Sequence, residues 1–142
     1  MRLELTQKSE LALQALNVLS RTPDGFASGP QIADALLISR HYLATVMAPL
    51  SRAGWVRSAT GPNGGYRLSL DMSNHSVLDL IESVEGTVDK DRCMHGDLMR
   101  PVQDPCALHE PWTRAREALL EELAAANLAE VLGIQPREGD EI

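Results

Sequence analysis

The sequence predicts a mainly α-helical fold with a small β-hairpin, and three observations predict it. Two short amphipathic segments, residues 28–37 and 39–54, follow each other with almost no linker. Two segments that alternate apolar and polar residues then enclose a glycine-rich loop at residues 58–65. A long amphipathic segment begins near residue 110. Helix, turn, helix and hairpin in this order define a winged helix-turn-helix, which we expect to be joined to a long helix.

The N-terminal helix is expected from Thr6 to Ser20, a mostly apolar stretch. Two short helices cannot bury much surface by themselves, so this third helix completes their core. Ser28 is a good N-cap for the first short helix, and Pro30 is tolerated in its first turn. The turn to the next helix is limited to about residues 37–38.

The second short helix is expected to begin after Ser39 and to end at Gly54. Pro49 falls late in this helix and removes one backbone hydrogen bond, so we expect a kink or an early end there. Residues 55–57 and 66–70 alternate as two short strands, and the turn-forming residues between them complete the hairpin, or wing.

A further short helix and a loop follow the wing. Ser76 and Asp79 have the spacing of a capping box and predict a helix through Val84 that ends at Gly86 and packs under the wing. Residues 87–106 show neither helical nor strand periodicity, and loops of this length inside a compact domain are usually functional or disordered.

A long helix is expected to start near Glu110 and Pro111. It has no sheet to cover, so its expected partner is the same helix of a second subunit; the alternative is that it packs back on its own domain. A homodimer would place two recognition helices about one DNA turn apart, on a palindrome-like site. The expected divisions are a winged helix-turn-helix DNA-binding domain at 1–86, a sensor loop at 87–109, a dimerisation helix with a short C-terminal helix at 110–134, and a polar tail at 135–142.

The start of the second short helix and the wing carry side chains that suit contacts with double-stranded DNA. Small polar and cationic side chains at the start of a recognition helix reach phosphates and base edges. Glycines in a wing let backbone N–H groups approach a phosphate closely. The candidate DNA contacts are Ser28, Gln31, Ser39, Arg40, His41, Tyr42, Thr45, Arg57, Asn63, Gly64, Gly65, Tyr66 and Arg67.

The charge distribution supports this assignment, although the net charge of the chain is −7. Residues 1–70 hold seven Lys and Arg against four Asp and Glu, a net charge of +3. Residues 71–142 hold six against sixteen, a net charge of −10. The positive half contains the helix-turn-helix, and the acidic half should repel DNA and so help to orient the protein on it.

Other classes of protein are disfavoured by what the sequence lacks. No nucleophile motif, phosphate loop or metalloprotease spacing supports an enzyme that would use His41, His95 or His109. No transmembrane run or secretory signal is seen, so we expect a cytoplasmic protein without a membrane partner. In that reducing compartment its two cysteines are not expected to form a structural disulfide.

A resemblance to a known family is carried by the segments LTQKSELALQAL, ISRHYLATVMAPLSRAGWVRS, GPNGGYRL, VLDLIESVEG, CALHEPWTRAREALLEEL and NLAEVLG. With these segments, the chain resembles the winged-helix regulators of the IscR, NsrR and RirA type over roughly residues 1–133. This resemblance implies a homodimer with paired long helices, a helix-turn-helix that reads DNA, and often an iron–sulfur cluster that switches DNA affinity. It also implies a transcriptional regulator, expected here to be a repressor.

The resemblance also implies a set of cluster ligands. Cluster-binding relatives commonly carry a further loop cysteine, whereas here the middle position falls on Met99, between Cys93 and Cys106. His109 follows Cys106 at the spacing of relatives with a histidine ligand, and Glu10 matches an acidic residue that some relatives supply from the other subunit. Two thiolates, an imidazole and a carboxylate can hold a [2Fe–2S] cluster.

Alternatives to this ligand set remain open. His95 is the spare histidine candidate, two residues after Cys93. Without a further loop cysteine, Cys93 and Cys106 could instead form a thiol redox switch in a cluster-free regulator of the same fold. A signal unrelated to cysteine is the third possibility. A histidine at a helix start can also be a simple cap, and Glu10 can simply favour the dipole of the first helix.

Overall fold

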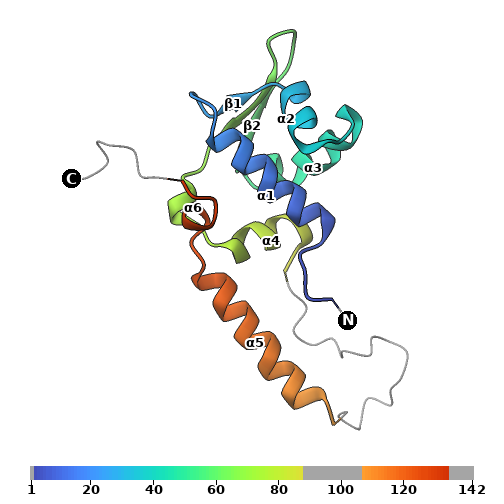
Figure 1. Cartoon of the computed structure of the whole chain (residues 1–142), viewed down its shortest axis with the longest axis vertical. Helices are drawn as coiled ribbons and strands as arrows, with labels where there is room; N and C mark the ends of the chain where they lie inside the picture. The colour runs from blue at the N-terminus through green and yellow to red at the C-terminus, as the bar shows by residue number, and fades with distance from the viewer. Residues whose placement is uncertain (1, 88–106, 135–142) are drawn as a thin grey trace, which may run out of the picture.

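The computed structural model describes residues 2–87 and 107–134, and the expected polar tail at 135–142 lies outside them. Figure 1 shows a body of short helices around a small sheet, from which one long helix projects. The helices are α1 (Gln7–Ser20), α2 (Gly29–Leu36), α3 (Arg40–Arg52), the 3-10 helix η1 (Met72–Asn74), α4 (Val77–Glu85), α5 (His109–Ala125) and α6 (Leu128–Val131). The strands are β1 (Phe26–Ala27), β2 (Val56–Ala59) and β3 (Gly65–Leu68). The predicted fold class is confirmed: the chain is mainly helical, with a winged helix-turn-helix and a long C-terminal helix.

The apolar faces of α1, α2 and α3 meet in one core. Leu16, Ile32, Val46 and Leu50 are fully buried there, together with Trp55 from the start of the wing. Each helix begins at the residue that the sequence predicts, because the side chains of Thr6, Ser28 and Ser39 accept a hydrogen bond from the backbone N–H three residues on. These caps fix where each apolar face starts and so set its orientation toward the core.

Of the two effects expected of Pro49, a kink or an early end of α3, the early end is wrong, because the helix continues to Arg52. Pro49 is buried on the same face as Val46 and Leu50, and its carbonyl accepts a hydrogen bond from the Ala53 N–H at 3.0 Å. Proline removes a single donor from this helix. The packing of the buried face against the core retains the last turn.

The sheet has three antiparallel strands in the order β1-β3-β2, so the wing is more than the expected hairpin. Phe26 pairs with Arg67 and Ala27 pairs with Tyr66, which makes β3 the central strand. The predicted pairing of β2 with β3 is present, with Arg57 opposite Arg67. The strand that the sequence analysis missed leads directly into the N-cap of α2.

Helix α4 was predicted to lie under the wing, but it packs mainly against α1, α3 and α5. It begins after Ser76 with the predicted capping box to Asp79 and ends at Gly86. It contacts the base of the wing through the Trp55 Nε1–H, which donates a hydrogen bond to the Ser83 Oγ at 2.9 Å. This bond joins the helix before the sensor loop to the first residue of the wing.

The segment after α5 returns to the DNA-binding body. The Val77 N–H donates to the Ala126 carbonyl at 3.0 Å, and the Leu128 N–H donates to the His75 carbonyl at 2.9 Å. The Asn127 Nδ2 also donates to the Ser73 carbonyl at 2.7 Å. These bonds anchor α6 beside η1. The start of α4 is thereby connected to α5 and α6, and its end leads to the predicted sensor loop.

The long helix α5 projects away from the body, with only its C-terminal part near α4 (Figure 1). None of its residues is buried, although Trp112, Leu119 and Leu123 recur at helical spacing. Leu119 is 52 % exposed. Among the described residues, no helix combines the length and the apolar character that a membrane span requires.

Candidate nucleic-acid interface

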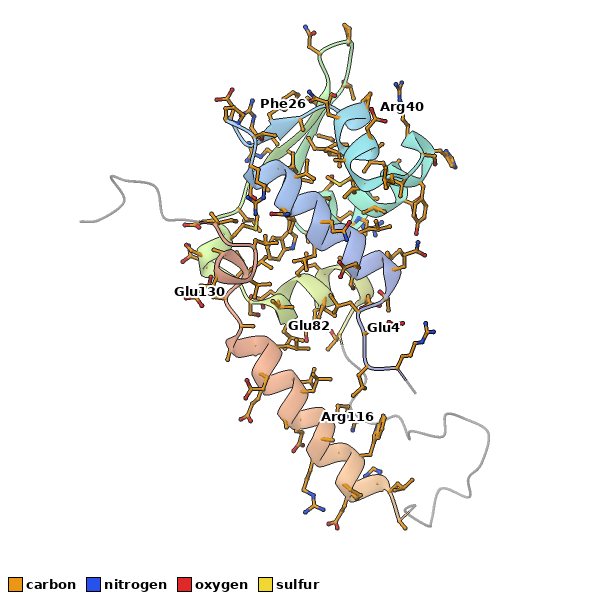
Figure 2. The ribbon with its side chains drawn as sticks, in the orientation of Figure 1. Glu4, Phe26, Arg40, Glu82, Arg116 and Glu130 are labelled. Atoms are coloured by element: carbon orange, nitrogen blue, oxygen red, sulfur yellow. The ribbon has the colours of Figure 1, made fainter. Side chains whose placement is uncertain are left out.

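The first turns of α3 present the predicted recognition residues to solvent. Arg40, His41 and Thr45 are exposed on one face of the helix, while Leu43 and Val46 are buried on the other. Figure 2 shows Arg40 projecting outward, away from the body. Tyr42 differs from this group because its side chain is half-buried and packs against the core. Its backbone N–H donates to the Ser39 Oγ at 3.0 Å, so Ser39 is a cap as well as a candidate contact.

Ala44 and Ala48 lie on the exposed face of α3 and were missed by sequence reasoning. They follow Arg40 at four-residue intervals, so they share one surface with it. Small apolar side chains in the major groove contact the methyl group of thymine. The four-residue spacing was visible in the sequence, but alanine carries no polar group that would have marked it as a candidate.

The two candidate contacts at the start of α2 are engaged with each other in a capping box. The Gln31 N–H donates to the Ser28 Oγ at 3.3 Å, and the Ser28 N–H donates to the Gln31 Oε1 at 2.9 Å. This reciprocal pair satisfies two donors at the helix start. The Gln31 amide N–H₂ group and the Ser28 hydroxyl proton are left to donate to DNA.

The double glycine of the wing has a packing reason. A Cβ at Gly64 would lie 2.4 Å from the Ala59 carbonyl oxygen, and one at Gly65 would lie 2.3 Å from that of Ala27. At both glycines the neighbouring backbone lies too close for any side chain to fit. Gly65 is buried, whereas Asn63 at the loop tip is exposed, so the tip is the part of the wing that can reach a phosphate.

The two wing arginines are placed differently, although they form a cross-strand pair. The Arg57 side chain is exposed and makes no hydrogen bond or ion pair with any residue that the structure describes. The Arg67 Nη1 donates to the Asp24 carbonyl at 2.8 Å, and its guanidinium carbon lies 5.3 Å from the centroid of the Phe26 ring. Arg67 is therefore held against β1, whereas Arg57 is free to meet DNA.

Of the predicted cluster ligands, only Glu10 and His109 fall within the described residues; Cys93, Cys106 and the alternative His95 lie outside them. Glu10 is exposed on α1, where its Oε1 accepts a hydrogen bond from the Gln14 Nε2 at 2.9 Å. His109 is exposed as the first residue of α5 and provides no cap to it. Within one chain the two are not brought together, because α5 begins at the end of the molecule remote from the body (Figure 1).

A partly buried hydrogen bond connects the helix that carries Glu10 to the helix that precedes the sensor loop. Ser9 is only 1 % exposed, and its Oγ donates to the Glu85 Oε2 at 2.8 Å. Glu85 is the last residue of α4, two positions before the predicted start of the loop. The start of α1 is in this way attached to the end of α4.

Comparison with known proteins agrees with this geometry. Residues 5–133 match the model of the Rrf2 family, described as iron-dependent transcriptional regulators. A curated relative is the HTH-type transcriptional regulator IscR of Yersinia enterocolitica, 33 % identical over 134 residues, which cover 94 % of this chain and 81 % of the relative.

Solved structures with the same fold include two named regulators. CymR, the global cysteine regulator of B. subtilis, superposes with a TM-score of 0.72 at 26 % identity, covering 95 % of this chain and 100 % of CymR. IscR of T. potens superposes with a TM-score of 0.70 at 25 % identity, covering 99 % and 93 % of the two chains.

Proposed function

Because the chain belongs to the Rrf2 family of DNA-binding transcriptional regulators, which are not enzymes, we propose that it is a homodimeric repressor that reads a palindrome-like site. The observation that carries this proposal is the exposed face of α3 formed by Arg40, His41 and Thr45, with the wing beside it. The start of α3 enters the major groove, and Arg57 and the tip at Asn63 meet the neighbouring phosphates.

The proposed dimer interface is α5. None of the residues of α5 is buried in the single chain, so its apolar stripe is a surface that a partner can cover. The same helix of a second subunit supplies a matching stripe through a twofold axis. The domain division at 1–86, 87–109 and 110–134 follows from this: the first unit binds DNA, the second senses, and the third sets the separation of the two recognition helices.

The proposed control acts through the sensor loop. Cys93, Cys106 and His109 of one chain, with Glu10 of the partner subunit, would hold a [2Fe–2S] cluster. The described donors suit this role, since His109 is exposed without capping the helix and one oxygen of the exposed Glu10 has no hydrogen bond in the described part of the chain. The cluster would supply sensitivity to oxidants, nitric oxide or iron supply, and its imidazole ligand must be neutral to bind.

The residues of the chain carry the response from the loop to the DNA surface. Glu85 precedes the loop and holds Ser9 of α1, while Ser83 on the same helix holds Trp55 at the base of the wing. A change in the loop that shifts α4 would therefore move α1 and the wing together. A difference of a few kcal/mol between two arrangements of the dimer is sufficient to change DNA occupancy greatly.

The decisive experiment is the visible spectrum of protein purified without oxygen, followed by titration with DNA. We expect brown protein with charge-transfer bands, which Cys93→Ala and Cys106→Ala abolish. The DNA site is first selected from random-sequence duplexes by the wild-type protein. Cysteine variants that bind this DNA like wild type in every redox state would contradict control by the loop.

A second candidate is a regulator without a cluster, in which Cys93 and Cys106 form a reversible disulfide. It is favoured by the presence of only two cysteines in the chain. The same experiment separates the two candidates, because this form of the protein is colourless. Its DNA affinity would change with a thiol oxidant and be restored by dithiothreitol, and either cysteine substitution would remove the response.

A further inference from the structure

We propose that Arg67 is a positioning residue: it holds the wing against the start of the helix-turn-helix and does not contact a phosphate. Arg57 and Arg67 share one predicted role, contact with DNA, but their surroundings in the structure differ. The inference rests on the proposed contact of the wing with DNA. In this arrangement Arg57 and the tip of the wing contact DNA, and Arg67 sets the position of the wing.

The first observation is the set of contacts of the Arg67 guanidinium. One amino group donates to the Asp24 carbonyl at 2.8 Å, and the guanidinium carbon lies over the Phe26 ring, 5.3 Å from its centroid. A guanidinium can serve a carbonyl with its edge and an aromatic ring with its face at the same time, and an ammonium group cannot reproduce that combination. Both partners belong to β1 or to the turn before it.

The second observation is the cross-strand position of Arg67. It lies directly opposite Arg57 in the register of β2 and β3, and like charges at such positions repel each other. The contacts with Asp24 and Phe26 direct the Arg67 side chain toward β1. Arg57 therefore remains as the unpaired cation of this strand pair. Figure 2 shows Phe26 and Arg40 on opposite sides of the DNA-binding end, so the Arg67–Phe26 contact is remote from the start of α3.

The third observation is what β1 connects. Its last residue, Ala27, precedes Ser28, the N-cap of α2. Besides the pairing of β1 with β3, the Leu68 N–H donates to the Gly25 carbonyl at 2.9 Å, and the backbones of Gly65 and Ser28 approach so closely that a Cβ at Gly65 would lie 2.8 Å from the Ser28 Cα. The central strand of the wing thus touches the first residue of the helix-turn-helix. Arg67 adds the side-chain contact at the other end of β1.

The test uses the DNA site selected by wild-type protein and measures affinity as a function of salt. Phe26→Leu removes the ring without changing charge, Arg67→Lys keeps the charge, and Arg67→Gln removes it. We expect each to weaken binding by roughly three- to fivefold, the loss of one such contact, with an unchanged salt slope. The double variant Phe26→Leu with Arg67→Gln should bind no more weakly than the weaker single variant.

Arg57→Gln is the matched control, because it lies opposite Arg67 and should lower the salt slope by about 0.9. The proposal is overturned if Arg67→Gln lowers the slope in the same way, or if Phe26→Leu binds DNA like wild type. A wing that makes no contact with DNA gives a different result, in which Arg57→Gln and Asn63→Ala are also without effect. Thermal unfolding of each variant separates a loss of folded protein from a loss of affinity.

Discussion

Arg40 is the side chain on which specific recognition should depend most. It is exposed at the first position of α3 and shares its face with Ala44. We expect Arg40→Ala to cost about 1–3 kcal/mol on the selected site and clearly less on random DNA. Arg52→Ala is the control, because Arg52 is exposed at the other end of the same helix. Competition titrations with specific and random duplexes measure the difference; equal losses on both would reduce Arg40 to a phosphate contact.

At the scale of residues, the sequence predicts which side chains are exposed but not what else they do. The polar character of Gln31 and Arg67 was correctly read as surface character. Gln31 is occupied in part by the cap of α2, and Arg67 is occupied by β1. The partner of Gln31 lies three residues away, whereas the partners of Arg67 belong to β1 and the turn before it. No local spacing in the sequence predicts the contact of Arg67 with β1.

The junction between α4 and the wing should be sensitive to a single hydroxyl. The Trp55 side chain is buried, and its Nε1–H has the Ser83 Oγ as acceptor at 2.9 Å. Ser83→Ala leaves this donor buried without a partner, which costs roughly 1–3 kcal/mol. Ser58→Ala, at an exposed position of β2, should change the free energy of unfolding by less than about 0.5 kcal/mol. Urea unfolding of both variants tests this, and equal stabilities would show that the bond contributes little.

At the scale of elements, the capped helices were predictable and β1 was not. Ser28, Ser39 and Ser76 mark helix starts because capping is a local interaction between residues three positions apart. β1 has two residues, too few to show alternation, and it is a strand only because β3 lies beside it. The continuation of α3 past Pro49 likewise depends on a core assembled from distant segments.

At the scale of the whole molecule, the two halves of the chain carry opposite net charges. The helix-turn-helix and the wing occupy one end, and α5 with its acidic residues extends from the other (Figure 1). The charge asymmetry could be read from the sequence, because it needs no knowledge of contacts. The projection of α5 could not, since an amphipathic pattern shows that a helix has a partner but not which molecule provides it.

The exposed stripe of α5 leads to a prediction about assembly. Leu119→Glu places a carboxylate on that stripe, and burying it in a dimer would cost on the order of 3 kcal/mol for each of the two copies, roughly 10,000-fold in the dissociation constant of the dimer. Val131→Glu is the matched control, because Val131 on α6 is 53 % exposed, against 52 % for Leu119. We expect Leu119→Glu to sediment as a monomer and Val131→Glu to sediment as a dimer. Leu119→Glu should also bind the palindromic site more weakly, because a single subunit contacts only one half-site. A Leu119→Glu protein that remains dimeric and retains its DNA affinity would place the dimer interface elsewhere.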